Sequence, residues 1–579
     1  MRSGMLISAA KPAAGCTRRQ TGAHDPEAAV TRNLLPIEVI AAKLGLSGDD
    51  YERRSSVSAK LSLDLLQRSP RGDRRGKMIL VTATTPTSAG EGKTVTSIGL
   101  VQGLERIGKS AIITSREPSL GPVFGMKGGA AGGGRARIEP AEKINLHFHG
   151  DFHAITSAHN LLAALLDSHL FHGNPLDIDP AEVSWPRALD MNDRALRRVI
   201  LSVTEPGQPQ RDGGNRASGF LITAASEIMA ILALAADRGD LRERISRIVV
   251  GASRQGAPVT AADLGATGPM LALLQEALLP NLVQTSEGTP ALVHCGPFAN
   301  IAHGTSSVIS HQMGVRLADY VVNETGFASD LGLEKYMDLV MPSSGIQPSL
   351  VVLVTTVQSL RWQGEGATGE EDDLTRGLIN LVKHISIVRS FGVPVVVAIN
   401  RFPSDADNDL HLLRRCCAEQ GAEFALSEAF AKGGEGAAAL ARKVVEVIDA
   451  NPRIEPQTAY AAHHSTVEKI SRVARSIYGA EDVAFSEQAR QHLARFERWG
   501  FGRLPVCIAK TQYSLTADPE CRVPPSRWTL HVTDVHLSAG AGFLVVIAGS
   551  MLLMPGLPRV SRALSIDVDD RTGEITGMV

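Results

Sequence analysis

The chain has 579 residues, 44% of them hydrophobic and 21% charged, and these proportions are ordinary for a globular protein of about three or four domains. The formal net charge of −2 argues against nucleic acid and an acidic membrane surface as partners. No C-x-x-C spacing occurs, which in a chain of this size favours reduced thiols and a cytoplasmic location. The six cysteines are Cys16, Cys295, Cys416, Cys417, Cys507 and Cys521.

The chain begins with a segment that we interpret as a disordered tail, residues 1–34. It contains Ala, Arg and Gly but lacks the apolar core of a secretory signal. Helical spacing of apolar residues then predicts helices at 37–44 and 58–66.

The most informative stretch is residues 78–99, MILVTATTPTSAGEGKTVTSIG. An apolar run gives way to Thr, Pro and Gly, and then Gly-Lys-Thr opens a pattern of small and apolar residues. This order predicts a buried strand, a tight loop and a helix. Loop N–H groups and the helix dipole favour a polyphosphate there. We therefore assign nucleotide binding to Thr87, Ser88, Ala89, Gly90, Glu91, Gly92, Lys93 and Thr94.

Two side chains of this loop have predicted roles. Lys93 can reach the β- and γ-phosphates, and the hydroxyl of Thr94 can bind Mg²⁺. Thr87 stands where the usual phosphate-loop pattern has its first glycine, so the loop is a variant. The alternative interpretation is a strand–loop–helix junction with an exposed lysine.

A second short strand is predicted at 110–114, and it runs directly into Arg116 and Glu117. A charged pair at the carboxyl end of a strand lies on the ligand edge of an open α/β sheet. The glycine-rich run at 125–134 is either a flexible linker or backbone that must approach a ligand closely.

An H-x-H-x-D pattern follows at His147, His149 and Asp151. It can place two imidazoles and a carboxylate on one side of a strand or turn, as a zinc hydrolase would need. The alternative is a loop in which these side chains satisfy local hydrogen bonds.

Buried helices are predicted at 161–166, 226–236 and 271–278, and from residue 350 strands alternate with helices. The strands are expected at 350–355, 394–399 and 423–426, and the helices at 376–391, 409–420 and 435–449. This alternation implies a parallel sheet. An uncharged stretch at 537–558 has membrane-crossing length, but glycine and proline interrupt it, and we predict a buried strand at 543–548.

Two aromatic residues, Phe402 and Phe430, lie in the loops after the last two of these strands. Because ligands bind at this edge, the two rings could stack on a flat heterocycle. Either phenylalanine alone would be ordinary core.

Several segments resemble the formate–tetrahydrofolate ligase (formyltetrahydrofolate synthetase) family, in that family's order and over nearly the whole chain. They are TPTSAGEGKT, REPSLGPVFGMKGGAAGGG, GPFANIAHG, PVVVAINRFPSD, ALSEAFAKGGEG, LPVCIAKTQYSL and LSAGAGF with MPGLP. The family has the same T-x-x-GEGKT form of the loop, which accounts for Thr87.

The resemblance implies an α/β fold with a P-loop-type parallel-sheet nucleotide-binding domain at 35–345. A second parallel α/β domain that contacts folate would occupy 346–460, and a smaller C-terminal domain 461–579. The implied reaction joins formate to tetrahydrofolate at the expense of MgATP, through formyl phosphate, and gives 10-formyltetrahydrofolate, ADP and phosphate. Family members are homotetramers.

The resemblance also implies residue roles. Lys93 and Arg116 would be catalytic, Arg116 holding formyl phosphate with its planar fork. The pterin ring would lie between Phe402 and Phe430. A monovalent cation, K⁺ or NH₄⁺, would bind at Glu117 and Asp151.

The chain departs from the family's pattern mostly outside the ATP and formyl phosphate positions. Phe430 stands in place of Trp, and His149 in place of Thr. Other departures are Arg135, Arg137, Lys143, Gln358, Gln363, Ser550 and the Leu-Val-Met-Pro run after Asp338. Two further hypotheses therefore stay open: a relative that binds nucleotide or folate without turnover, and a ligase for a different small carboxylate.

Overall fold

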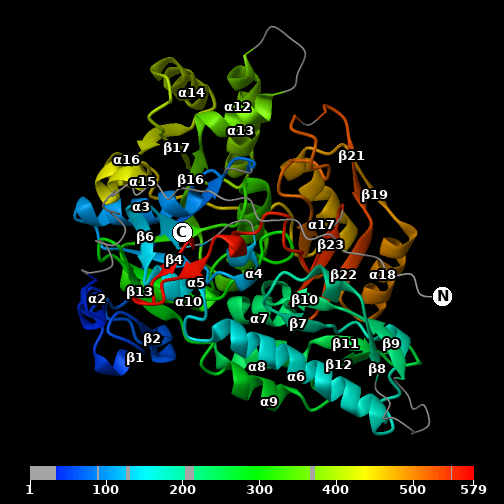
Figure 1. Cartoon of the computed structure of the whole chain (residues 1–579). Helices are drawn as coiled ribbons and strands as arrows, with labels where there is room; N and C mark the ends of the chain where they lie inside the picture. Colours follow the sequence, from blue (N-terminus) through cyan, green and yellow to red (C-terminus); the bar gives the residue numbers. More distant parts are fainter. Residues whose placement is uncertain are drawn as a thin grey trace, which may run out of the picture.

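The structure, a computed structural model, describes residues 34–87, 90–125, 129, 131–202, 214–365, 372–523, 525–549 and 551–578. Most of the predicted tail, Ser88 and Ala89 of the predicted loop, and Ser550 lie outside these residues. The predicted α/β class is confirmed, because a large sheet is flanked by helices on both faces (Figure 1).

The central sheet has twelve strands. Its main path runs β1 (Tyr51–Arg53), β2 (Ala59–Leu61), β13 (Asn281–Thr285), β14 (Pro290–Val293), β4 (Ala111–Ser115), β15 (Tyr320–Glu324), β3 (Lys77–Ala83), β16 (Pro348–Thr355), β17 (Val395–Asn400) and β18 (Glu423–Ser427). Off this path, β6 (Ala136–Glu139) pairs with β13 and with β5 (Gly132–Gly133). Neighbouring strands from β14 to β18 pair in parallel. Their carboxyl ends therefore share one edge of the sheet.

Alternate residues of each parallel strand face opposite helical layers. In β3, Ile79 and Val81 pack with α3 (Lys93–Arg106) and α16 (Gly434–Ala450). Met78 and Leu80 join the core that contains α10 (Val308–Leu317) and α13 (Asp373–Ser390). Burial on both faces explains why the strands read as continuous apolar runs.

The remaining helices cover the sheet or build smaller subassemblies around it (Figure 1). They are α2 (Ile37–Lys43), α4 (Leu120–Phe124), α5 (Ala141–Asn145), α6 (Asp151–Phe171), α7 (Glu227–Leu234), α8 (Arg238–Ser246), α9 (Thr267–Leu274), α11 (Met341–Ser344), α12 (Val357–Gly364), α14 (Asp407–Glu419), α15 (Ala429–Lys432), α17 (Thr466–Val473) and α18 (Glu487–Arg498). The predicted helices from 37 to 44 and from 161 onward are all found, although α9 begins and ends earlier than expected.

Smaller sheets complete the fold. Short pairs are formed by β7 (Arg187–Leu189) with β10 (Phe220–Ile222), β8 (Val199–Ser202) with β9 (Asn215–Ser218), β11 (Val249–Ala252) with β12 (Pro258–Thr260), and β24 (Asp567–Val568) with β25 (Ile575–Thr576). Towards the C-terminus, β19 (Asp482–Phe485) pairs with β21 (Thr529–Val532), and β20 (Val506–Ala509), β23 (Phe543–Ile547) and β22 (Asp534–Ser538) form a three-stranded sheet.

The predicted helix at 58–66 was wrong. The structure has strand β2 there, followed by a 3₁₀ helix at Leu63–Leu66. β2 is held between β1 and β13, and the side chain of Lys60 is buried against Asp151. Pairing with strands distant in sequence has overridden the local helical spacing.

The strands of the expected second domain continue the main sheet. β16 pairs with β3 from Pro348 to Val354, and β17 and β18 follow it. In the part of the chain that the structure describes, these three strands therefore share one sheet with β3, β15 and β4. The boundaries at 345/346 and 460/461 stay predictions.

The uncharged stretch near the C-terminus contains β23 at Phe543–Ile547, which confirms the predicted strand. Within the described residues, none of the helices combines the length and the apolar character that crossing a bilayer requires.

Two buried carboxyl groups, Glu334 and Asp338, lie one helical turn apart between β15 and β16. Oδ1 of Asp338 accepts a hydrogen bond from the backbone N–H of Ala459 (2.7 Å), and Lys335 Nζ lies 3.3 Å from Glu334 Oε2. Burial, and then the adjacent Glu334, raise the pKa of Asp338 well above its usual value. Burial of the two adjacent carboxyl groups therefore favours the neutral form of Asp338.

Replacing Asp338 by asparagine is therefore expected to remove a pH dependence of stability. A native carboxyl pKa above the unfolded value makes stability fall as pH rises from the unfolded pKa towards the folded one, by up to about 1.4 kcal/mol per pH unit. Asparagine keeps the acceptor for Ala459 and never ionises. Unfolding midpoints measured between pH 5 and 9 should show the variant gaining on the wild type as pH rises, and parallel curves would contradict the raised pKa of Asp338.

Candidate active site

The loop between β3 and α3 is shaped by two glycines with left-handed backbone. Gly90 has φ +78° and Gly92 has φ +72°, and Gly92 is the residue before the first turn of α3. Oε1 of the buried Glu91 accepts the backbone N–H of Thr87 (2.6 Å), which ties the two ends of the loop together. Burial raises the pKa of Glu91, and the Lys93 ammonium partly offsets this effect.

The predicted phosphate ligands lie at the start of α3. Lys93 and Thr94 are half-buried, and the structure records no ion pair or hydrogen bond within its described residues for the ammonium of Lys93 or the hydroxyl of Thr94. Both groups stand at the amino end of a helix of 14 residues, where the dipole favours an anion. The placement of both groups is compatible with the predicted phosphate and magnesium roles, which stay predictions.

A residue at the end of β17, two strands away from β3 in the sheet, supports the loop. Asn400, the last residue of β17, donates from Nδ2 to the carbonyl of Glu91 (2.6 Å) and accepts from the hydroxyl of Thr96 at Oδ1 (2.7 Å). A Cβ on Gly92 would lie 2.5 Å from this Nδ2. Position 92 therefore requires glycine for its backbone angle and for its contact with Asn400.

A Gly92→Ala variant is expected to lose about 5-fold to 150-fold in kcat/KM for ATP, because the added methyl group must displace Asn400 and strain the backbone, which together cost about 1–3 kcal/mol. Steady-state kinetics with varied ATP would measure this loss. Gly108→Ala is a suitable control, since Gly108 also has positive φ (+77°) but nothing lies within 4 Å of its Cβ position.

The start of the loop rests on a buried histidine, His384 of α13. Burial lowers the pKa of His384 to about 4, so the ring is neutral at pH 7. Its Nε2 accepts the backbone N–H of Thr85 (2.9 Å), and its Nδ1 donates to Ser329 Oγ (2.7 Å). Asn380 of the same helix donates to the Thr85 hydroxyl (2.9 Å). These supports were not anticipated, because a histidine within a helical pattern carries no sequence signal for a distant loop.

Arg116 follows β4 on the same edge, two strands from β3, with β15 between them. Adjacent strands lie about 4.8 Å apart, so the two strand ends are separated by about 10 Å. Nη1 of Arg116 donates to the carbonyl of Pro297 (3.2 Å), and Nη2 lies 3.8 Å from Oε1 of Glu324 at the end of β15. Burial lowers the pKa of Arg116, Glu324 partly restores it, and the guanidinium remains charged.

The two predicted cation ligands lie in a buried cluster beside Arg116. Glu117 is 3% exposed, and its Oε2 has no hydrogen-bond partner among the described residues. Burial and the nearby Asp151 raise the pKa of Glu117 well above its usual value. Both oxygens of Asp151 contact the ammonium of Lys60, at 2.6 and 2.8 Å. Glu117 thus has one oxygen without a partner among the described residues, whereas Asp151 is paired with Lys60, and the cation site stays a prediction.

The H-x-H-x-D pattern makes local hydrogen bonds. His149 is bonded to Ser58 Oγ (3.0 Å) and to Asn281 Oδ1 (2.7 Å), and Asp151 is paired with Lys60. Within the ranges that the structure describes, no group of three or more His, Cys, Asp or Glu side chains could hold a metal ion. The zinc hypothesis is therefore not supported, and the local interpretation is the one observed.

Phe402 and Phe430 follow the adjacent strands β17 and β18, whose last residues, Asn400 and Ser427, are paired. Their side chains are unusually open for phenylalanine, with 46% and 63% of the residue surface exposed. The described part of the glycine-rich run packs on the second ring, since a Cβ on Gly133 would lie 3.2 Å from Phe430 Cε2. This run therefore allows a close backbone approach; residues 126–128 and 130 lie outside the described residues.

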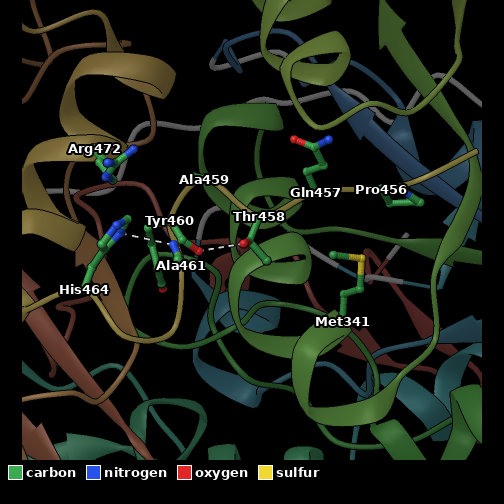
Figure 2. Close-up of a pocket in the computed structure, with 9 residues that line it drawn as sticks. All are labelled: Met341, Pro456, Gln457, Thr458, Ala459, Tyr460, Ala461, His464 and Arg472. Carbon is green, nitrogen blue, oxygen red and sulfur yellow. Dashed lines mark hydrogen bonds between the residues drawn. The ribbon is translucent and has the colours of Figure 1, made fainter.

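Two surface cavities of the described structure are compared with the predicted site. One, of about 450 Å³, is lined by Phe402 together with Trp362, Arg361 and Asp409. The other, of about 460 Å³, lies between α11 and α17 (Figure 2), and the nine residues that line it include no predicted site residue. In Figure 2 the backbone N–H of Ala461 is bonded to His464, so this histidine supports its own loop. Of these two cavities, only the first is lined by a predicted site residue, Phe402.

Fold and site together define an α/β enzyme with a lysine and an arginine after strands whose carboxyl ends share one edge of a parallel sheet, the edge at which such folds bind ligands. The comparison with known families identifies this class more closely. The family model for formate–tetrahydrofolate ligase matches residues 23–579, and the chain belongs to this family. The resemblance predicted from the sequence is confirmed, and the protein is a ligase.

Proposed function

We propose that the enzyme activates formate with ATP as formyl phosphate and transfers the formyl group to tetrahydrofolate. The observation that carries this proposal is the placement of Lys93 and Arg116 at the ends of β3 and β4, on one edge of one sheet. Formate is a weak electrophile because its carboxylate is resonance-stabilised. Phosphorylation converts one of its oxygens into a good leaving group.

In the first step an oxygen of formate attacks the γ-phosphorus of ATP, and the bond to ADP breaks. Lys93 would neutralise the transferring phosphoryl group, and the loop from Thr87 to Thr94 would hold the phosphates, with the N–H groups at the start of α3 as donors. Arg116 would orient formate and then hold both ends of formyl phosphate with its planar fork. Mg²⁺, held by Thr94 and the nucleotide, would offset the charge on the phosphate oxygens.

In the second step the N10 amine of tetrahydrofolate attacks the formyl carbon. The carbon–oxygen bond to phosphate breaks, phosphate leaves with the electron pair, and N10 loses its proton. The exposed rings of Phe402 and Phe430 would bind the pterin by stacking. The cavity beside Phe402 offers room for the rest of the folate.

Two further features of the proposal come from the resemblance, and a third, the cytoplasmic location, comes from the cysteine pattern. A monovalent cation, K⁺ or NH₄⁺, would bind at the free oxygen of Glu117, near Asp151. The active form would be a homotetramer, and the enzyme would work in the cytoplasm.

The deciding experiment is ADP release measured with formate, MgATP and tetrahydrofolate, each omitted in turn. The proposal expects release that requires all three, with formation of 10-formyltetrahydrofolate in equal amount. Release that ignores formate or tetrahydrofolate would count against it. Nucleotide or folate binding without turnover would favour a non-catalytic relative, and turnover with another short carboxylate would favour an altered substrate.

A further inference from the structure

The loop after β14 encloses the guanidinium of Arg116. Besides the bond from Arg116 to Pro297, the backbone N–H of Gly326 donates to the carbonyl of Gly304 (2.8 Å), which joins this loop to the end of β15. A Cβ on Gly326 would lie 3.1 Å from Nη1 of Arg116 and 2.4 Å from the Cβ of Ala299. Small residues thus close around the arginine and leave little space for a ligand.

His303 in this loop is fully buried, and neither of its ring nitrogens has a hydrogen-bond partner among the described residues. The other buried histidines of the described chain each have at least one ring nitrogen bonded; they are His159, His294, His311 and His384. An imidazole with both nitrogens unpaired is costly in a protein interior, and such groups normally serve a ligand or an ordered water.

Two other buried polar atoms of these segments are also unpaired in the described structure: Oε2 of Glu117, which follows Arg116 in the chain, and Oδ1 of Asn300, three residues before His303. Unsatisfied polar atoms thus occur both next to Arg116 in the chain and in the loop whose Pro297 carbonyl accepts from its guanidinium. Such a set is suited to a small polar molecule that enters after folding.

The ring of His303 does not change its charge near pH 7, so it can donate a hydrogen bond as a neutral imidazole. Burial lowers the pKa of His303 to about 3, and His311, Arg116 and Arg244 add to this effect. The ring is thus neutral at pH 7, with one N–H donor and one lone pair. The positive charge next to it is supplied by Arg116 and does not depend on pH.

We propose that His303 is a substrate-binding residue, whose ring N–H donates to an oxygen of the one-carbon carboxylate held by Arg116. This inference rests on the proposed function and adds a second recognition group to it. The enclosure by Ala299, Gly304 and Gly326 restricts this subsite to an acid as small as formate.

The test compares two substitutions, His303→Leu and His303→Gln, with the wild type. We expect His303→Leu to raise KM for formate at least tenfold and to leave KM for ATP unchanged, because ATP binds the other loop. His303→Gln retains an N–H donor and should recover part of the loss. The upward shift in melting temperature that sodium formate gives the wild type should disappear in His303→Leu.

A matched control is His159→Leu. His159 is equally buried, but its Nδ1 is bonded to Ser226 Oγ (2.9 Å) and its Nε2 to the carbonyl of Pro186 (3.0 Å). Its loss should lower the melting temperature and leave KM for formate unchanged, whereas His303→Leu should not lower the melting temperature.

Two results separate failure of this inference from failure of the proposed function. Wild-type enzyme without formate-dependent ADP release would contradict the function itself. Active wild type, with unchanged KM for formate in both His303 variants, would overturn only the inference. If His303→Leu does not fold, His303→Gln still decides, because an unchanged KM and an unchanged formate shift in that variant would also overturn it.

Discussion

Lys93→Ala is expected to lower kcat/KM for ATP by a hundredfold or more. The ammonium of Lys93 has no ion-pair partner in the described structure, so its charge is available for the phosphates. Electrostatic groups of this kind supply about 3 kcal/mol or more of transition-state stabilisation. Coupled ADP-release kinetics at saturating formate and tetrahydrofolate would measure the change.

Lys109→Ala provides the control for this experiment. Lys109 follows the opposite end of α3 and precedes β4, so it lies towards the amino edge of the sheet. Its removal should leave both kcat and KM near the wild-type values. If Lys93→Ala behaved like Lys109→Ala, the loop before α3 would not be the site of phosphoryl transfer.

Arg116→Ala is expected to lower kcat/KM for formate by a hundredfold or more, because the variant loses the guanidinium that would bind the carboxylate. Arg116 is the guanidinium placed beyond β4, its side chain is 25% exposed, and its fork can hold two oxygens of one ligand at once. Arg116→Lys should restore little activity, because a point charge does not reproduce two parallel hydrogen bonds. Kinetics with varied formate would measure both variants.

Arg106→Ala is the corresponding control. Arg106 ends α3 and is paired with Glu287 at the surface, where such ion pairs contribute little. Wild-type kinetics are expected. An Arg116 variant with unchanged kcat/KM would remove the role assigned to this residue, even if Lys93 proved essential.

Much of this arrangement could be predicted from the sequence because it depends on local patterns. The run before Thr84 is apolar because β3 is buried on both faces, and Gly92-Lys93-Thr94 marks the start of a helix after a tight loop. Arg116 was placed at a ligand edge because it directly follows the short strand β4. Each of these inferences needs only residues that are adjacent in sequence.

Features that depend on distant residues could not be predicted in this way. The sequence does not indicate that Asn400 would brace the loop at Glu91, or that His384 would hold Thr85, because each pair is about three hundred residues apart. The strand at 59–61 was mistaken for helix for the same reason, since its partner β13 lies far along the chain. His303 stood in a recognised motif, but only the three-dimensional structure shows that its ring lacks partners.

The pairing of β16 with β3 links the predicted domains more closely than their boundaries suggest. A fragment cut at residue 345 would lose the ladder along Met78 to Ala83 and expose the flank of β3 as a long apolar edge. Such an edge is a template for intermolecular strand addition. The fragment that ends at residue 345 is therefore not expected to fold as an independent domain. Expressed without β16, it is expected to aggregate through the exposed edge of β3.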